Sequence, residues 1–156
     1  MPKEENKFKA MIQKTLDTYK PKIDAERKTE LSTSTYKVDK PWGHEIWLEV
    51  NEFYTMKLIH MKEGNRSSLQ SHEMKYETNI VVQGEAEVQL DDENGNLKSE
   101  TFKAGEGWSV PVGRRHRVIA NTDYTAIECS TSHLDDVFRY QDDTNRPSGK
   151  IESEHK

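Results

Sequence analysis

Short runs of alternating apolar and polar residues dominate the chain from Tyr36 to about Tyr140. The clearest runs are HEIWLEV, YTMKLIHM, TNIVVQG, AEVQL, GWSVPV, HRVIAN and TAIECS. A period of two is typical of strands that bury one face of a sheet. Turn residues such as the Asn94-Gly95 pair separate the runs, and no helix-length apolar pattern interrupts them. The pattern therefore predicts an all-β domain built as an antiparallel sandwich or a closed roll.

The two ends of the chain differ from this central region. Four apolar residues near the start recur at helical spacing, namely Phe8, Ile12, Leu16 and Tyr19. We expect an amphipathic helix that ends at Pro21 and packs across the domain or against a second subunit. The predicted organisation is a helical extension with a linker (1–35), a β-barrel domain (36–146) and a tail (147–156) that has nothing to bury and is expected to be disordered.

Composition narrows the class of protein. The chain has 156 residues, enough for one domain, and its net charge of -5 without a basic stripe argues against nucleic-acid binding. No apolar run near the start resembles a signal peptide or a membrane span. The lone cysteine, Cys129, cannot form an internal disulfide. We therefore expect a cytoplasmic protein with no nucleic-acid or membrane partner.

Four residues in two stretches have side chains that suit one divalent metal ion. Gln70 and His72 lie two apart, so in a strand they leave the same face, and Glu77 can return to that face after a short turn. His116 follows a turn at Pro111 and begins a later strand. Two imidazoles, a carboxylate and an amide suit zinc first, and also manganese, cobalt, nickel or iron. Taken alone, either histidine is more often an ordinary surface or core residue.

The residues that frame these candidates resemble the two motifs of the cupin superfamily. The first motif corresponds to Gly64, Gln70, His72, Glu77 and Gly84, with glutamine where many members have a first histidine. The second motif corresponds to Gly105, Pro111, Gly113 and His116. The resemblance runs from about Tyr36 to Arg146 and implies an all-β double-stranded β-helix, or jelly roll, with the metal inside the barrel.

Within this superfamily one branch is more similar to the chain. KPWG (40–43), Lys57, SLQSH (68–72) and DDVFRYQDDTNR (135–146) resemble, in order and spacing, the cupin-type (type II) mannose-6-phosphate isomerases. The resemblance implies a homodimeric, metal-dependent isomerase of carbohydrate metabolism, in particular of polysaccharide biosynthesis. The stretch HEMKYET and the ending TNR differ from the family pattern at positions expected to face the sugar, so the substrate could be a related sugar.

The implied reaction assigns roles to six further residues. An aldose-ketose isomerase needs an electrophile, a base that moves a proton between adjacent carbons, and cations that hold a phosphate. We expect catalytic roles for Lys57, Glu128 and Arg139, and substrate contacts for Arg146, Trp42 and Arg114. The expected reaction is the interconversion of mannose 6-phosphate and fructose 6-phosphate, or of a related sugar phosphate.

Several alternatives stay open at this point. Lys57 could pair on the outer face of a sheet, Glu128 could anchor a lysine, and the arginines could pair with neighbouring aspartates. Two histidines and a carboxylate also form the metal site of non-haem iron oxygenases. A non-catalytic sugar-binding cupin, with the N-terminal helix as its docking element, is the third class.

Overall fold

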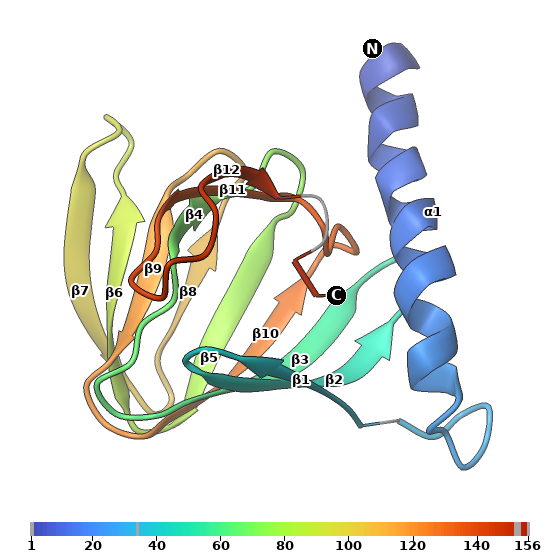
Figure 1. Cartoon of the computed structure of the whole chain (residues 1–156), viewed down its shortest axis with the longest axis horizontal. Helices are drawn as coiled ribbons and strands as arrows, with labels where there is room; N and C mark the ends of the chain where they lie inside the picture. The colour runs from blue at the N-terminus through green and yellow to red at the C-terminus, as the bar shows by residue number, and fades with distance from the viewer. Residues whose placement is uncertain (1, 34, 152–153, 156) are drawn as a thin grey trace.

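Two six-stranded antiparallel sheets face each other within the residues that the computed structural model describes, 2–33, 35–151 and 154–155 (Figure 1). The first sheet runs in the order β1 (Tyr36–Lys40), β2 (Gly43–Val50), β3 (Thr55–Met61), β10 (Tyr124–Ser130), β5 (Glu77–Gln83) and β8 (Gly107–Val110). The second runs in the order β12 (Gly149–Ile151), β11 (Val137–Gln141), β4 (Leu69–Ser71), β9 (His116–Ala120), β6 (Glu85–Asp91) and β7 (Leu97–Lys103).

From β3 onward the chain crosses repeatedly between the two sheets. Strands β4, β9 and β11 lie in the second sheet, whereas β5, β8 and β10, which alternate with them along the chain, lie in the first. This winding closes the sheets into a roll and places the ends of distant strands next to one another. The prediction of an all-β antiparallel roll is confirmed.

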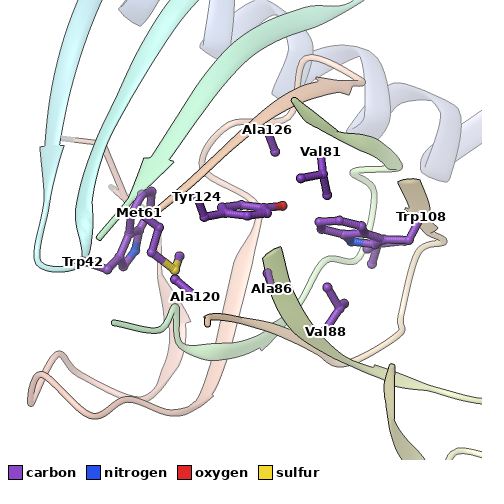
Figure 2. Packing of buried hydrophobic residues seen from close by; sticks show 10 residues of the cluster. Trp42, Met61, Val81, Ala86, Val88, Trp108, Ala120, Tyr124 and Ala126 are labelled. Atoms are coloured by element: carbon purple, nitrogen blue, oxygen red, sulfur yellow. The ribbon is translucent and has the colours of Figure 1, made fainter. Parts of the chain in front are cut away.

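One part of the interior between the sheets is an apolar core (Figure 2). The ring of Tyr124 lies between Trp42 and Met61 on one side and Trp108 on the other. The Trp108 ring also contacts Phe102 of β7, with 5.1 Å between the ring centroids. These large side chains fill one part of the barrel, and buried polar side chains lie next to them.

Helix α1 (Pro2–Asp24) packs against β2 on one side of the barrel (Figure 1). Tyr19 and Ile23 are fully buried in a second apolar cluster, which they share with Trp47 of β2. The Tyr19 hydroxyl also donates a hydrogen bond of 2.6 Å to the Asp135 carboxylate. The helix therefore shares a core with the first sheet, as one of the two expected packing modes requires.

The helix continues past Pro21, where the sequence predicted its end, so that prediction is wrong. A proline inside a helix removes one backbone donor and costs roughly 3 kcal/mol or more. Complete burial of Ile23 in the next turn offsets much of this cost, because burying such a side chain contributes about 1.5–3 kcal/mol. Among the described residues, no helix combines the length and the apolar character needed to cross a bilayer.

The segment that follows β11 is ordered where the sequence predicted a disordered tail. Gly149–Ile151 forms β12 and pairs with β11 through three residue pairs. Glu154 and His155 are largely buried, while the rest of the tail, residues 152, 153 and 156, lies outside the described residues. The prediction is wrong for the described part, because backbone pairing and buried charges replace the apolar contacts that this segment lacks.

Gly84 joins β5 to β6 with a left-handed backbone, at a φ of 84°. A Cβ at this position would overlap the carbonyl oxygen of Asp123. We expect Gly84→Ala to lower the free energy of unfolding by more than about 2 kcal/mol, since the left-handed conformation alone costs roughly 1–2 kcal/mol. Gly95→Ala is the matched control, because Gly95 has a φ of 78° but open space around it. Equal losses for the two variants in urea unfolding would contradict the role of the close contact.

Candidate functional site

Three buried side chains converge inside the barrel at the ends of three strands. His72 follows β4, Glu77 begins β5 and His116 begins β9. His72 Nε2 lies 3.5 Å from Glu77 Oε2, and His116 Nε2 lies 3.6 Å from Glu77 Oε1. The candidate ligand atoms of all three residues lie within 4.8 Å of one another. The structure thus brings three of the four predicted metal ligands together.

Both histidines are held with Nε2 directed at this cluster. His72 Nδ1 donates to the backbone carbonyl of Asp136 at 2.6 Å, and His116 Nδ1 donates to that of Arg114 at 3.2 Å. A proton on Nδ1 leaves a lone pair on Nε2, which is the arrangement found in metal-bound histidines. Among the described residues, His72 Nε2 is buried and has no hydrogen-bond partner. The donor set therefore fits a divalent metal ion.

The protonation states of the cluster also favour binding of a divalent metal ion. Burial lowers the pKa of His116 to about 4, so its imidazole is neutral at pH 7. Burial alone would raise the pKa of Glu77, but the Lys75 ammonium, 3.0 Å away, holds it well below its usual value. His116 and Glu77 are therefore in the protonation states that bind metal ions.

Gln70, the fourth predicted ligand, lies in the same region. It pairs with His116 across β4 and β9, and its side chain lines the cavity beside the three other candidates. Its Oε1 atom accepts a hydrogen bond of 3.2 Å from the Ser68 hydroxyl. The structure places Gln70 where a ligand is needed, and its binding to the metal remains a prediction.

The turn between β4 and β5 is fixed by a residue that sequence reasoning missed. The Asp136 carboxylate accepts hydrogen bonds from the backbone amides of Glu73, Met74 and Lys75, at 3.1, 2.6 and 2.8 Å. The backbone carbonyl of Asp136 also holds His72. One residue thus positions both the first histidine and the turn that returns the chain to Glu77.

A network of lysines and carboxylates lies next to the metal-type cluster, which is the group formed by His72, Glu77 and His116. Lys57 is 1% exposed, and its ammonium lies 3.1 Å from Glu45 and 3.9 Å from Glu128. Lys75 lies 3.4 Å from Glu128 on another side. Lys57 therefore faces the interior, and the alternative of an outer-face lysine is wrong.

The pKa of the Glu128 carboxyl group is displaced in the opposite direction to the pKa values of Glu45 and Glu77. Burial raises its pKa, and the negative charge of Glu77 raises it further, while Lys75 and Lys57 oppose both effects. The pKa of Glu45, by contrast, lies far below its usual value, because Lys57 and other cations outweigh its burial. Two carboxyl groups in one cavity with pKa values displaced in opposite directions are typical of acid-base sites.

The free space inside the barrel is small. Two cavities of about 60 and 70 Å³ share part of their lining: Trp42, Glu45, Ser67, Gln70 and Glu128. The Trp42 ring is buried and belongs both to this wall and to the apolar core. Pockets that bind small molecules usually measure about 300–1,000 Å³. A sugar phosphate therefore enters only if some lining residues move.

The predicted arginines lie in different surroundings. Arg139 is buried and donates to the Pro147 carbonyl and to the Glu154 carboxylate. Arg146 lines the cavity and pairs with Asp142, as one alternative predicted, and also with Glu154. Arg114, by contrast, donates to the backbone carbonyl of Asp91 and does not line the cavities.

Several cavity residues were not among the sequence candidates. Glu45 shares one face of β2 with Trp47, so alternation along HEIWLEV could have identified it. Lys75 lies in a turn, and Glu154 and His155 lie in a polar segment, where no periodicity signals burial. Only the folded arrangement reveals these three.

Comparison with known proteins adds to this geometry. The family described as "Mannose-6-phosphate isomerase C-terminal" matches residues 26–142. Alginate biosynthesis protein AlgA of Pseudomonas aeruginosa is 33% identical over 128 residues, which cover 77% of this chain and 25% of that protein. A putative mannose-1-phosphate guanylyltransferase of Vibrio cholerae is 32% identical over 109 residues, which cover 66% of this chain and 22% of that protein. The chain thus spans about a quarter of the length of these relatives.

Solved structures show the same fold at low sequence identity. Oxalate decarboxylase from Bacillus subtilis aligns with a TM-score of 0.60 and 20% identity, over 72% of this chain and 32% of that chain. KdgF from Halomonas sp. aligns with a TM-score of 0.55 and 18% identity, over 62% of this chain and 87% of that chain. The family match over most of the residues, together with this fold, shows that the chain belongs to the mannose-6-phosphate isomerase C-terminal family of cupins.

Proposed function

We propose that this protein is a metal-dependent isomerase that interconverts mannose 6-phosphate and fructose 6-phosphate, or a closely related pair of sugar phosphates. The observation that carries the proposal is that the Glu128 carboxyl group, with its raised pKa, lines one buried cavity together with Gln70, Glu77 and His116. The family match and the mannose-phosphate relatives support a sugar phosphate as the substrate class.

The residues that would hold the metal are His72, Glu77 and His116, with Gln70 as a neutral fourth ligand. A bound divalent ion would supply a Lewis acid that polarises the sugar carbonyl and the adjacent hydroxyl group. Zinc is the first candidate for this ligand set, and manganese, cobalt, nickel and iron are the others.

Glu128 is the proposed acid-base residue. Its carboxylate would remove the proton from C2 of the aldose and return it to C1, while the hydroxyl proton passes from O2 to O1, so that no atom is gained or lost. Lys57 and Lys75 flank this carboxyl group, at 3.9 and 3.4 Å. We assign Lys57 a positioning role, since it is held by Glu45 and packs its ammonium 5.0 Å from the Trp47 ring centre.

The phosphate would be held at the outer end of the cavity. Arg146 lines this end and Arg139 lies close to it, through their shared partner Glu154. A guanidinium group can donate two parallel hydrogen bonds to two phosphate oxygens, and this geometry would fix the orientation of the sugar. Trp42 would form part of the wall along the ring of the substrate. Arg114 has no such place in the cavity and carries no part of this proposal.

Activity with mannose 6-phosphate is the direct test. We expect the metal-loaded protein to produce fructose 6-phosphate, followed by NMR, and Glu128→Gln to lower kcat at least about 100-fold, because general acid-base catalysis contributes about 10²–10⁴-fold. The metal content of the variant should equal that of the wild-type protein, since Glu128 lies outside the proposed ligand set.

Glu100→Gln is the matched control, because Glu100 is an exposed carboxylate on β7, outside the barrel cavity. Unchanged kcat in Glu128→Gln would overturn the assigned role of Glu128. A fully metal-loaded wild-type protein that converts neither mannose 6-phosphate nor related sugar phosphates would overturn the isomerase.

A further inference from the structure

Three cations surround one carboxylate at the outer end of the cavity. Arg139 Nη2 lies 2.5 Å from Glu154 Oε2, Arg146 Nη1 lies 3.4 Å from Glu154 Oε1, and Lys40 Nζ lies 3.3 Å from Glu154 Oε1. The Glu154 side chain is 11% exposed. Lys40, at the end of β1, also donates to the backbone carbonyl of Glu154 at 3.1 Å. A single carboxylate is thus the shared partner of three side chains from separate parts of the chain.

His155 extends this contact inward. Its ring lies 5.1 Å from the Trp47 ring and 6.0 Å from the Tyr19 ring, measured between centroids. Its Nδ1 atom accepts from Lys40 Nζ at 3.0 Å and lies 3.7 Å from a Glu45 oxygen. Both Glu154 and His155 line the cavity of about 60 Å³. These two residues therefore fill space that leads toward the metal-type cluster.

The same two residues are the best placed to move. They follow β12, a strand that pairs with β11 over only three residue pairs. β12 is also the edge strand of the second sheet, whereas Lys57 and Glu128 lie on β3 and β10 at the centre of the first sheet. Because the cavity is far smaller than a ligand pocket of about 300 Å³, entry of a sugar phosphate requires such a movement.

Lys40, Arg139 and Arg146 bring three positive charges to this position, where Glu154 is their shared carboxylate partner and Asp142 pairs with Arg146 alone. Arg139 Nε is buried and has no hydrogen-bond partner among the described residues. A phosphate monoester carries a charge of about -1.5 to -2 at pH 7 and offers three acceptor oxygens, whereas a carboxylate offers two and a single charge. The three cations thus suit a phosphate better than they suit Glu154.

We propose that Lys40, Arg139 and Arg146 form a phosphate subsite, that the Glu154 carboxylate occupies it as an internal competitor, and that a phosphate ligand displaces Glu154 together with His155. The nature of the sugar attached to the phosphate rests on the proposed function. The competition between Glu154 and phosphate does not, because inorganic phosphate suffices to reveal it.

Glu154→Gln tests the competition directly. The substitution keeps the size of the side chain and removes its charge, so we expect the dissociation constant of inorganic phosphate, measured by calorimetry at equal metal content, to fall at least about tenfold, which corresponds to about 1.4 kcal/mol. Glu93→Gln, in the exposed β6–β7 turn, makes the same change of charge away from the cavity and should leave the constant unchanged. Equal phosphate affinity in wild type and Glu154→Gln would overturn the proposal.

A second measurement uses the unmodified protein. While Glu154 and His155 occupy the cavity, the neighbouring rings of Trp47 and Tyr19 shift the NMR signals of the His155 ring. Saturation with inorganic phosphate should move these signals toward the values of a solvent-exposed histidine. If the signals stay in place while phosphate saturates the protein, His155 is not displaced. This result does not depend on whether the Glu154→Gln variant folds.

Different results would overturn the isomerase proposal and the phosphate-subsite proposal. Under the isomerase proposal, Glu154→Gln should also lower KM for mannose 6-phosphate about tenfold. Tighter phosphate binding without any turnover would support the subsite and count against the isomerase. Turnover with unchanged phosphate affinity would support the isomerase and overturn the subsite.

Discussion

His72→Ala is expected to lower the affinity for divalent metal at least about 100-fold. Residues that only orient metal ligands already account for about 10–100-fold, and His72 presents its Nε2 atom directly to the cluster. The loss leaves Glu77 and His116 without the third side chain that lies within 4.8 Å of both. Elemental analysis of the purified protein, followed by titration of zinc or manganese against a competing chelator, measures the change.

His60→Ala provides the control for this experiment. His60 lies on β3 outside the barrel cavity, where Nδ1 is hydrogen-bonded to the Thr125 hydroxyl at 3.0 Å. Its removal deletes the same imidazole group and should leave metal content and affinity as they are in the wild-type protein. If His72→Ala retains one metal ion with unchanged affinity, the cluster is not the metal site.

Trp47→Ala is expected to lower the free energy of unfolding by about 3–5 kcal/mol, the usual cost of deleting a buried tryptophan side chain. Trp47 is 0% exposed, and its ring packs against the Tyr19 ring of α1 with 5.1 Å between the ring centroids. Its indole Nε1 also donates to the buried Glu45 carboxylate at 2.8 Å. The substitution therefore leaves a cavity and removes a hydrogen bond from a buried charge at the same time.

Chemical denaturation of the wild-type protein and of Phe53→Ala completes this comparison. Phe53 is 77% exposed, and its replacement should change stability by no more than about 0.5 kcal/mol. A loss below about 1 kcal/mol for Trp47→Ala would show that α1 and β2 do not form the shared core described above.

Local sequence patterns predicted the strands and the metal-type cluster well. Alternation of apolar and polar residues reports which face of a strand is buried, so runs such as HEIWLEV and TAIECS appear as β2 and β10. The convergence of His72, Glu77 and His116 was predictable from the spacing of the candidate ligands together with the resemblance of their framing residues to the two cupin motifs. These features depend on a few neighbouring residues, and such signals are visible in one sequence.

The features that the sequence did not predict, such as the end of α1 and the ordered Glu154, depend on residues far away in the chain. Pro21 predicted a helix end, but burial of Ile23 against β2 carries the helix onward. Glu154 is ordered by Lys40, 114 residues away, and by Arg139. No local pattern encodes such pairing, because the polar residues near the end of the chain look the same whether their charges are solvated or buried.

The shared core of α1 and β2 has a practical consequence for shortened forms of this protein. The strand pattern alone suggests an expression boundary at Tyr36, just before β1. Such a fragment would lose Tyr19 and Ile23, leaving the inner side of the Trp47 cluster open to water and Asp135 without its hydroxyl donor. Exposed apolar patches of this kind promote aggregation. Fragments made for crystallisation, or for fusion to another domain, should therefore retain the first helix.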